Sequence, residues 1–393
     1  MPPATPHSFA PPNADVGRPA AVQTKVVADF VVVGSGLTGA TIARLLTDAG
    51  REVVVLERRG HVGGNVHDHV HASGVRIHTY GPHYFRTNAE RIWAYATRFD
   101  DFHPYEATLL SRVDGRHEHW PVTAEYIRRT IGDTWTPAFT GTPTNFEDAS
   151  LAMMPAPVFD KFVRGYTEKQ WGVPVTQLDA ELARRFDVRH DGDVRLMRHR
   201  WQGIPVRGYA AWTRAMLDGI PVITGFDYLE HREAVRARRT LVFTGPIDAF
   251  YDHAYGRLAY RGQRRIHTHH PDVLGFLQPA GQVNHPSVAD GPQIRTLEWK
   301  HMMPPAERNG IRGTVVTQEI PESPSDADRF EYPFPDARNR ALYRAYRAKA
   351  DEESGVLICG RLGEYRYYDM DQAIARAMLL AQQLLAASRS VAA

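Results

Sequence analysis

The apolar positions near the start of the chain predict a strand, a helix and a second strand. Residues 30–33 form an uninterrupted apolar run with β-branched side chains, which is typical of a buried parallel strand. A helix is predicted from there to about Ala49, because apolar side chains recur on one face and Gly50 ends the pattern. Residues 52–56 form the second strand. This order indicates a βαβ unit.

Further elements follow from the same kind of pattern. Polar and apolar residues alternate over 67–78 around Ser73-Gly74, which indicates a hairpin. Mostly strands and turns are expected over 258–333. Helices are also predicted over 88–99, 338–349 and 371–387, and buried strands ending in glycine turns over 241–246 and 355–360. Because αβ segments return at both ends of the chain, we predict a discontinuous α/β domain with insertions.

Composition narrows the class of protein. The 393 residues are 43% hydrophobic, which is enough for two or three domains with apolar cores. The formal net charge of +2 gives no bulk attraction to nucleic acid or to a membrane. The single cysteine, Cys359, excludes an internal disulfide and fits a reducing compartment. The sequence has no run of about 18 apolar residues, so we expect no membrane span and a cytoplasmic location.

The N-terminal segment has a different composition. It is rich in Pro and Ala and lacks an apolar stretch. We therefore expect residues 1–27 to be a disordered tail and not a signal peptide.

A glycine pattern follows the first predicted strand. Gly34, Gly36 and Gly39 have the G-x-G-x-x-G spacing: the first allows a tight turn, the second lets backbone approach a pyrophosphate, and the third packs the helix against the strand. Glu57, at the end of the second strand, would accept hydrogen bonds from ribose hydroxyls and repel the 2′-phosphate of NADP. A purely structural turn is the alternative, but the order and spacing of all the parts favour a dinucleotide site.

The continuation of this unit distinguishes FAD from NAD. Arg58-Arg-Gly-His-Val-Gly-Gly-Asn65 resembles the extended fingerprint of the glutathione-reductase and amine-oxidase class of flavoproteins. We therefore predict FAD as the cofactor. The predicted FAD-binding residues in this unit are Gly34, Ser35, Gly36, Thr38, Gly39, Glu57, Arg58, Gly64 and Asn65.

Four further motifs, at 78–88, 165–172, 201–209 and 360–370, carry a resemblance to a known family. The most specific strings are Tyr-Thr-Glu-Lys-Gln-Trp within the second and Glu-Tyr-Arg-Tyr-Tyr-Asp-Met within the fourth. With the FAD fingerprint they resemble the UDP-galactopyranose mutase family over residues 28–385. The resemblance implies an isomerase that interconverts an NDP-hexopyranose and an NDP-hexofuranose, most simply those of UDP-galactose. In this chemistry N5 of reduced FAD attacks the anomeric carbon, without net redox.

The resemblance also implies the domains and partners. We expect an α/β protein with a discontinuous Rossmann-like FAD-binding domain, an inserted helical domain that forms a homodimer contact, and an antiparallel β-sheet domain. We assign 28–98, 202–255 and 340–390 to the first domain, 99–165 to the second, and 166–201 and 256–339 to the third. The expected partners are a nucleotide-sugar substrate and an unidentified reductant or reductase, with no nucleic acid.

A departing diphosphate is anionic, so its site needs arginine and phenol donors. The resemblance implies that Arg185, on a mobile loop, and Arg295 hold the diphosphate, and that His83 lies near the flavin without acting as a general base. Seen alone, each arginine would more often be a solvated surface charge. The implied substrate-binding residues are Phe162, Tyr166, Trp171, Asn284, Tyr332, Tyr365 and Tyr368, with Tyr367 structural. Thr244, Gly245, Arg361, Asp369 and Met370 are expected to face the flavin.

The chain departs from the family pattern at one position. A substrate-contacting tyrosine is expected eleven residues after the loop arginine, where this chain has Leu196. Nucleotide and sugar therefore stay open, and the same chemistry on a GDP-linked or N-acetylated sugar is an alternative. An amine-oxidase-type oxidoreductase and a non-catalytic nucleotide-sugar sensor are alternatives from other classes.

Two clusters are interpreted without a function. His67, His69 and His71 alternate along a predicted strand, as metal ligands might be spaced, but no carboxylate or thiolate accompanies them, so no metal site is predicted. The basic run at 231–239 lacks aromatic residues for stacking and is interpreted as a solvated face.

Overall fold

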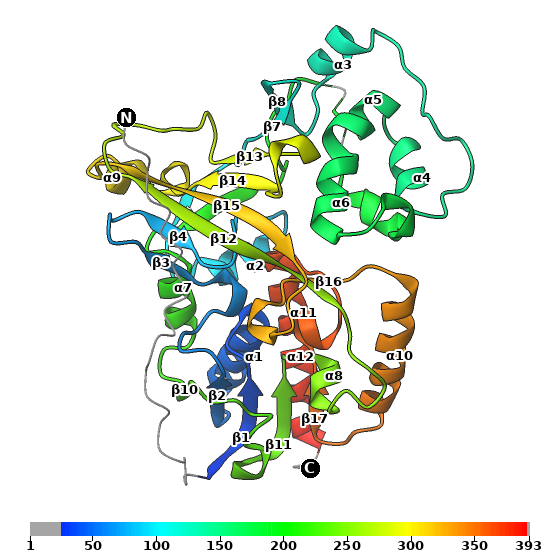
Figure 1. Cartoon of the computed structure of the whole chain (residues 1–393). Coiled ribbons are helices and arrows are strands. Elements are labelled where there is room, and N and C mark those ends of the chain that lie inside the picture. The colour runs from blue at the N-terminus through cyan, green and yellow to red at the C-terminus, as the bar shows by residue number, and fades with distance from the viewer. Residues whose placement is uncertain (1–24, 187, 190, 391–393) are drawn as a thin grey trace.

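The computed structural model describes residues 25–186, 188–189 and 191–390 (Figure 1). Residues 1–24, most of the tail predicted over 1–27, lie outside this set. A parallel sheet lies in the lower half of Figure 1, a mixed sheet crosses the upper half, and a group of helices lies at the upper right.

The lower sheet has five parallel strands in the order β10-β2-β1-β11-β17. They are β1 (Val26–Val33), β2 (Val53–Glu57), β10 (Val222–Thr224), β11 (Val235–Phe243) and β17 (Val356–Ile358). At the carboxyl edge Val33 pairs with Leu56 on one side and with Phe243 on the other. The chain returns to this sheet from distant segments, so the predicted discontinuous Rossmann-like domain is confirmed.

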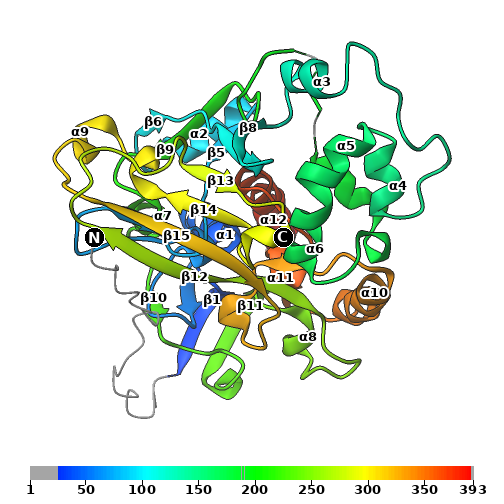
Figure 2. The ribbon, with the colours of Figure 1, turned by 45° about the horizontal axis from the view of Figure 1, so that its top comes forward.

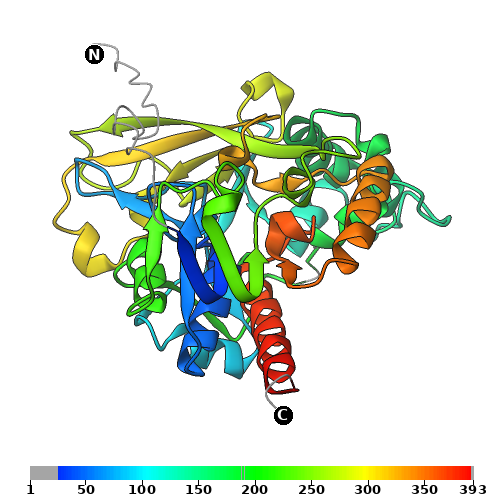
Figure 3. The same ribbon diagram turned by 90° about the horizontal axis from the view of Figure 1, so that it is seen from below.

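Helices cover both faces of the parallel sheet, as the view from below shows (Figure 3). Phe30 and Val32 pack with α1, α7 and α12 on one face, whereas Val31 packs with α8 and α10 on the other. Successive strand side chains point to opposite faces, which explains why the run at 30–33 is apolar throughout. The helices are α1 (Leu37–Asp48), α7 (Tyr209–Met216), α8 (Ile247–Phe250), α10 (Ala337–Asp351) and α12 (Met370–Ser390).

The upper sheet has seven strands in the order β16-β12-β15-β14-β13-β7-β8 (Figure 2). Only β13 and β7 run parallel; the other neighbouring strands are antiparallel. The strands are β7 (Leu109–Val113), β8 (Arg116–Trp120), β12 (Tyr260–His270), β13 (Gln282–Asn284), β14 (Arg295–Glu298), β15 (Thr314–Glu322) and β16 (Tyr332–Pro333). The strands and turns predicted over 258–333 are therefore confirmed.

The helical unit lies beside the mixed sheet (Figure 1). Phe146, Phe159 and Val163 form its core, and Trp120 of β8 packs against them. The helices are α3 (Ala124–Thr130), α4 (Phe146–Leu151), α5 (Ala156–Val158), the π-helical η2 (Phe159–Arg164), α6 (Gly165–Trp171), η3 (Val175–Gln177) and η4 (Ala180–Arg185). We therefore propose that the helical domain spans about 123–186, because β7 and β8 pair into the mixed sheet and η3 and η4 pack with the helices.

Smaller elements complete the molecule. The predicted hairpin is confirmed by β3 (Asp68–Val70) and β4 (Arg76–His78), in which Asp68 pairs with His78. A three-stranded sheet contains β5 (Phe85–Thr87), β9 (Trp201–Pro205) and β6 (Phe102–Pro104). The short helices are η1 (Gly64–Val66), α2 (Glu90–Ala96), η5 (Arg232–Ala234), η6 (Val288–Asp290), η7 (Trp299–Met302), α9 (Pro305–Arg308), η8 (Ala327–Arg329) and α11 (Gly360–Gly363). Across the described residues, no helix is both long and apolar enough to span a bilayer.

Candidate active site

The glycine-rich turn lies at the carboxyl end of β1, where α1 begins. Gly34 has a φ of +99°, a conformation that residues with a Cβ rarely adopt. A Cβ on Gly39 would lie 1.9 Å from the carbonyl oxygen of Gly34, so only glycine lets the helix pack on the turn. The N-cap residue of α1, Gly36, offers no side-chain hydrogen bond to the first N–H groups of the helix. These N–H groups are therefore suited to a pyrophosphate.

Glu57 ends β2 beside this turn and is buried. Its Oε2 accepts hydrogen bonds from the N–H and Oγ of Ser35 at 2.8 and 2.6 Å, and its Oε1 accepts from the N–H of Arg59 at 2.9 Å. A carboxylate has about four acceptor positions, so Oε1 keeps one for a ribose hydroxyl. The free acceptor position on Glu57 fits a ribose hydroxyl of FAD, and the free N–H groups of α1 fit its pyrophosphate.

Other predicted cofactor residues lie around the same edge. A Cβ on Gly64 would lie 2.8 Å from the Cα of Gly36, so the two glycine segments touch. Thr244, which precedes Gly245, donates from Oγ1 to the carbonyl oxygen of Val33 at 2.8 Å and joins the ends of β1 and β11. Thr38 is buried in the first turn of α1.

The two neighbouring arginines after β2 have different surroundings. Arg58 forms a surface ion pair with Asp328 at 2.6 Å, and its side chain is 36% exposed. Arg59 is 11% exposed and donates to Oδ1 of Asn65 at 3.0 Å. Its guanidinium carbon also lies 4.2 Å from the ring centre of Tyr80. Arg58 is the arginine predicted to bind the cofactor. In the structure, however, the side chain that contacts Asn65, another predicted cofactor residue, is that of Arg59.

A cleft lies between the carboxyl edge of the parallel sheet and the mixed sheet. It brings together the predicted residues Asn65, His83, Arg295, Tyr332, Arg361, Tyr368, Asp369 and Met370. The other residues lining it are Tyr80, Pro82, Tyr84, Arg86, Glu331 and Tyr367. Arg86 and Asp369 form an ion pair at 3.0 Å. The lining residues come from three separate stretches of the chain, 65–86, 295–332 and 361–370.

His83 is a neutral imidazole in this cleft. Its Nδ1 lies 2.7 Å from the carbonyl oxygen of Gly81, which can only accept, so Nδ1 carries the proton and Nε2 is an acceptor. Burial, together with the charge of Arg361, lowers the pKa of His83 to about 3. An imidazole with this pKa is a weak base at neutral pH, which agrees with a cofactor-tuning role.

Arg295 belongs to a buried network of alternating charges. Its Nε donates to the carboxylate of Glu319, and the other carboxylate oxygen accepts from Nε of Arg265 at 2.7 Å. Arg265 binds Glu331 through both terminal nitrogens, at 2.9 and 3.0 Å. Burial alone would lower the pKa of Arg295, but the Glu319 carboxylate outweighs it and raises the pKa. Arg295 is therefore a fixed cation at the cleft.

Arg361 supplies a second cation to the cleft. Its guanidinium donates to the carbonyl oxygens of Glu331 at 3.1 Å and Tyr368 at 2.9 Å. It also lies 4.7 Å from the ring centre of Tyr367. Because both acceptors are uncharged, these bonds position the guanidinium without neutralising it. Its positive charge can therefore attract an anionic ligand.

The tyrosines after α11 are arranged differently from the prediction. The rings of Tyr332 and Tyr367 stack at 5.9 Å between centres with an interplanar angle of 10°, and both line the cleft. Tyr365, predicted to bind substrate, instead accepts a hydrogen bond from the N–H of Phe334 at 3.0 Å and donates to the carbonyl oxygen of Ala259 at 2.5 Å. Its hydroxyl is occupied by backbone and it does not line the cleft. Tyr368 lines the cleft, and its hydroxyl bonds to Glu364 at 3.2 Å.

The phenols at the cleft are protonated at neutral pH. Burial raises the pKa of Tyr332 to about 12, and burial followed by the charge of Glu364 raises that of Tyr368 to about 12. Protonated phenols can donate hydrogen bonds to phosphate oxygens.

The predicted nucleotide-facing residues lie beyond the cleft, toward the helical unit. Tyr166 of α6 lies close enough to Arg295 to influence its pKa, and Asn284 of β13 pairs with Arg295 of β14. Trp171 packs edge-on behind Tyr332, with ring centres 6.4 Å apart. Phe162 is 4% exposed and packs within the core of the helical unit.

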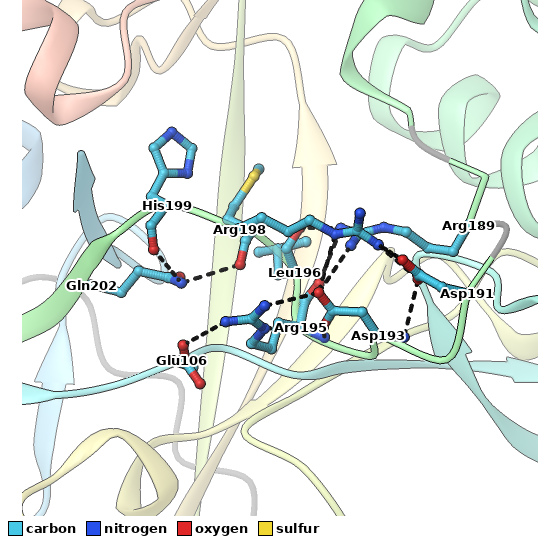
Figure 4. Close-up of polar contacts among 10 residues, drawn as sticks. Glu106, Arg189, Asp191, Asp193, Arg195, Leu196, Arg198, His199 and Gln202 are labelled. Carbon is cyan, nitrogen blue, oxygen red and sulfur yellow. Dashed lines mark hydrogen bonds and ion pairs between the residues drawn. The ribbon is translucent and has the colours of Figure 1, made fainter. Parts of the chain in front are cut away.

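Arg185 is the last residue of η4, and its side chain lies outside the described residues. Leu196 follows in the segment that leads to β9, and its N–H donates to the carbonyl oxygen of Ala107 at 2.7 Å. Its side chain has no hydrogen-bond donor, so it cannot supply the phenol expected at this position. Figure 4 shows the charged residues around it.

The histidines of the first hairpin bond to hydroxyl groups. Nδ1 of His67 and Nδ1 of His69 lie 2.9 and 3.0 Å from the same Thr79 hydroxyl. In the described part of the chain, no group of three or more His, Cys, Asp or Glu side chains has an arrangement that could hold a metal ion.

The geometry supports one kind of chemistry. A dinucleotide site at the carboxyl edge of the parallel sheet opens into a cleft that holds two arginines and protonated tyrosines. Such donors stabilise an anion that departs from a substrate. The neutral His83 beside them does not add a strong base.

Two family models match the chain. The model described as UDP-galactopyranose mutase matches residues 161–367, and a model of NAD(P)-binding Rossmann-like domains matches residues 32–99. The first covers the later part of the helical unit, from residue 161 in η2 onward, and the cleft residues from Arg295 to Tyr367, and the second covers the glycine-rich unit.

Relatives match over nearly the whole chain. A probable UDP-galactopyranose mutase of Klebsiella pneumoniae is 30% identical over 372 residues, covering 91% of this chain and 94% of that protein. A dTDP-fucopyranose mutase of Escherichia coli is 30% identical over 373 residues, covering 90% and 97%. A crystal structure of reduced UDP-galactopyranose mutase has the same fold, with a TM-score of 0.68 at 15% identity over 91% of this chain and 96% of that one.

Proposed function

This chain belongs to the UDP-galactopyranose mutase family, and we propose that it interconverts the pyranose and furanose forms of a nucleoside-diphosphate hexose, with UDP-galactose as the first candidate. It is an isomerase of the mutase type, and its cofactor is FAD. The alternative of an amine-oxidase-type enzyme is not favoured, because two relatives that are 30% identical over 91% and 90% of this chain are mutases.

The cofactor would be held by the glycine turn, Glu57 and the N-terminal part of α1, with its reactive ring toward the cleft. When bound in its reduced form, FAD would supply a nucleophilic nitrogen for attack at the anomeric carbon of the sugar. Asn65 and Met370 line the cleft on the cofactor side. His83, held in one tautomer by Gly81, would orient a polar edge of the ring through Nε2.

The chain's own contribution to catalysis is the stabilisation of the departing diphosphate. Arg295 is charged and fixed by Glu319, so little reorganisation is needed as negative charge develops. Tyr332 and Tyr367 present stacked phenols on the same wall. Arg185, at the end of η4, is the second arginine proposed to bind the diphosphate. Together they would hold the anion until it reattaches to the contracted or expanded ring.

One observation carries the proposal: Arg295, Arg361 and the two stacked tyrosines meet at the mouth of a dinucleotide site. The test is to incubate the purified protein with UDP-galactofuranose and dithionite and to separate the products by chromatography. Formation of UDP-galactopyranose supports the proposal. Absence of conversion with every UDP, dTDP and GDP sugar tried, despite bound reduced FAD, would remove it.

A dTDP-linked sugar is the second candidate substrate. The dTDP-fucopyranose mutase relative is as similar to this chain as the UDP-galactopyranose mutase relative, at 30% identity each. Leu196 at the expected tyrosine position supports a difference in at least one substrate contact. Competition of UDP, dTDP and GDP for the reduced protein in calorimetry would identify the base, and the GDP-linked alternative would gain only from a preference for GDP.

Three further properties are proposed on the family resemblance. We expect a homodimer through the helical unit and reduction of FAD by a separate cellular reductant, in a cytoplasmic protein. Analytical ultracentrifugation that finds only monomers at micromolar concentration would contradict the first.

A further inference from the structure

The loop between β13 and β14, residues 285–294, connects two predicted substrate residues and lies against α6 (Figure 1). Asn284 ends β13 and Arg295 begins β14, and the two pair with each other across the hairpin. The loop is closed by a hydrogen bond from the N–H of His285 to the carbonyl oxygen of Ile294 at 2.7 Å. Because Arg295 follows the loop directly, the position of the loop helps to set the point from which this side chain extends into the cleft.

Lys169 of α6 binds both arms of this loop. Its ammonium donates to the carbonyl oxygens of His285 at 2.9 Å and Ser287 at 2.5 Å on the outgoing arm, and to that of Gln293 at 3.1 Å on the returning arm. An ammonium has three N–H donors, and these three acceptors use all of them. The side chain is half-buried, and burial lowers the pKa of Lys169 against the opposing charge of Asp290. Lys169 is therefore placed to hold the loop and not to bind the diphosphate itself.

Gly165, the first residue of α6, makes a second close contact with the loop. A Cβ on Gly165 would lie 2.3 Å from the carbonyl oxygen of Pro286, far inside van der Waals contact. The loop therefore touches the backbone of the helix at this point, and Lys169 holds the loop one turn further along. One contact is a steric fit and the other is a set of charge-assisted hydrogen bonds, so each can be altered without the other.

The helix α6 is anchored to the mixed sheet by contacts that do not involve the Lys169 ammonium. Arg261 of β12 donates from Nε to the carbonyl oxygen of Gln170 at 2.7 Å and from Nη2 to that of Lys169 at 3.2 Å. Gln263, also on β12, donates from Nε2 to Oε1 of Gln170 at 2.7 Å. A cation at the C-terminal end of a helix also interacts favourably with the helix dipole. Loss of the ammonium should therefore release the loop while α6 stays on the sheet.

We propose that Lys169 is a positioning residue that sets the distance between Tyr166 on α6 and Arg295 on β14. This inference rests on the proposed function, in which Arg295 binds the diphosphate, and on Tyr166 as a nucleotide contact. Tyr166 and Lys169 are three residues apart on one helix, so they are neighbours on its surface. The bond from Lys169 to Gln293 ends two residues before Arg295, so the substrate would bridge two elements whose separation this lysine fixes. A misplacement of about 1 Å in a binding group can lower a rate by about 100-fold.

The test is a double-mutant cycle of Lys169→Met and Arg295→Lys. Methionine keeps an unbranched stem and removes the ammonium, and lysine at position 295 keeps a charge while losing the planar guanidinium. For all four proteins we would measure kcat and KM with UDP-galactofuranose, the dissociation constant of UDP, FAD content and the melting temperature.

Lys300→Met is the matched control. Lys300 is buried and also holds a loop through backbone, because its ammonium donates to the carbonyl oxygens of Ile311 at 3.1 Å and Gly313 at 3.0 Å. It does not line the cleft. Both lysine variants should therefore lower the melting temperature, whereas only Lys169→Met should alter the binding of UDP.

Lys169→Met is expected to weaken UDP binding and lower kcat/KM by about tenfold when Arg295 is present, and by less than about twofold in the Arg295→Lys background. FAD content should stay unchanged. Equal effects in both backgrounds, or an equal loss of UDP binding in Lys300→Met, would overturn the positioning role while leaving the mutase proposal intact. If the unaltered protein neither binds UDP, dTDP or GDP nor turns over any of their sugars, the proposed function fails and this inference with it.

Gly165→Ala tests the same contact without altering a charge, and it covers the case in which Lys169→Met does not fold. Alanine is favoured over glycine in a helix, so α6 should keep its structure, but the added Cβ would displace the loop. UDP binding should weaken by about threefold or more, with the same dependence on Arg295. Unchanged UDP binding in Gly165→Ala, or an equal loss in the Arg295→Lys background, would count against the proposal.

Discussion

At the scale of single residues, the charge of the cleft depends on where two buried carboxylates lie. Glu319 bridges Arg265 and Arg295, and Glu331 binds the far side of Arg265. The positive charges of these two arginines balance the negative charges of the two glutamates. The net positive charge near the cleft therefore comes from groups such as Arg361, which bonds to neutral carbonyl oxygens. An incoming diphosphate would meet fixed donors in an already desolvated site.

Replacing Arg295 by Ala should lower kcat/KM by about 100-fold or more, equivalent to about 3 kcal/mol of transition-state stabilisation, as for the loss of one oxyanion-site donor. The measurement is steady-state kinetics on the mutase reaction, and Arg312→Ala, whose side chain is 74% exposed, is the control. Unchanged turnover in Arg295→Ala would place the diphosphate elsewhere.

Two neighbouring tyrosines offer a matched pair of substitutions. Tyr367→Phe removes a hydroxyl at the cleft and should raise KM with little change in melting temperature. Tyr365→Phe removes hydrogen bonds to backbone atoms of Ala259 and Phe334 and should lower the free energy of unfolding by about 1–2 kcal/mol without changing KM. KM is measured by steady-state kinetics and the free energy of unfolding by urea unfolding. A raised KM in Tyr365→Phe together with a lowered free energy of unfolding in Tyr367→Phe would refute this arrangement.

The same tyrosines show what the sequence could predict about the site. The motif at 364–370 indicated that phenols meet the substrate, but its spacing could not tell which side chain turns inward. Tyr365 has a φ of +45°, a turn conformation that changes the direction of the chain. No sequence rule predicts this conformation at a tyrosine. Likewise, Arg58 and Arg59 are adjacent and chemically identical, and only tertiary contacts, such as those of Arg59 with Asn65 and Tyr80, distinguish them.

At the scale of elements, a group of neighbouring histidines lies on and around the β3–β4 hairpin and β12. The rings of His61 and His67 stack at 3.8 Å, and those of His71 and His269 lie 5.3 Å apart. Burial, followed by the neighbouring histidines, lowers the pKa of His67 to about 3. Burial and then His69 and Arg265 lower the pKa of His267 to about 4.

These shifts predict a loss of stability in mild acid. The unfolded chain binds protons at these histidines near pH 6.5, whereas the folded chain does so only at lower pH, so the free energy of unfolding falls as pH decreases from about 6.5 toward 4. The melting temperature should therefore be lower at about pH 5 than at about pH 7.5. The variant His67→Asn/His267→Asn should flatten this dependence relative to His117→Asn on β8. An equal pH dependence in both would contradict the prediction.

Element prediction succeeded where the signal was local. The βαβ unit, the hairpin at 67–78 and the helices that became α10 and α12 follow from periodicity and glycine or turn residues. The strand order of the mixed sheet does not follow from local patterns, because β7 pairs with β13, which lies far along the chain. The domain assignment of 99–165 separated β7 and β8 from the sheet they join, since pairing between distant strands leaves no local pattern.

At the scale of the whole molecule, the mixed sheet lies over the carboxyl edge of the parallel sheet, and the helical unit lies beside the mixed sheet (Figure 1). The chain passes repeatedly between the sheets, so the cofactor edge and the anion-binding wall form one folded body. This arrangement allows FAD chemistry at one end of a substrate while its nucleotide extends toward Tyr166 and the helices. The fold class was predictable from sequence because motifs for both halves are present in one chain.

The central claim is that reduced FAD in this cleft isomerises a nucleotide sugar without being consumed. The most direct measurement is anaerobic: the protein is reduced once with dithionite, excess reductant is removed, and UDP-galactofuranose is added while the flavin spectrum and the products are followed. We predict many molecules of UDP-galactopyranose per flavin, an unchanged reduced spectrum, and no product with oxidised protein. Reoxidation of the flavin in step with sugar consumption, or no more than one turnover per flavin, would contradict the account.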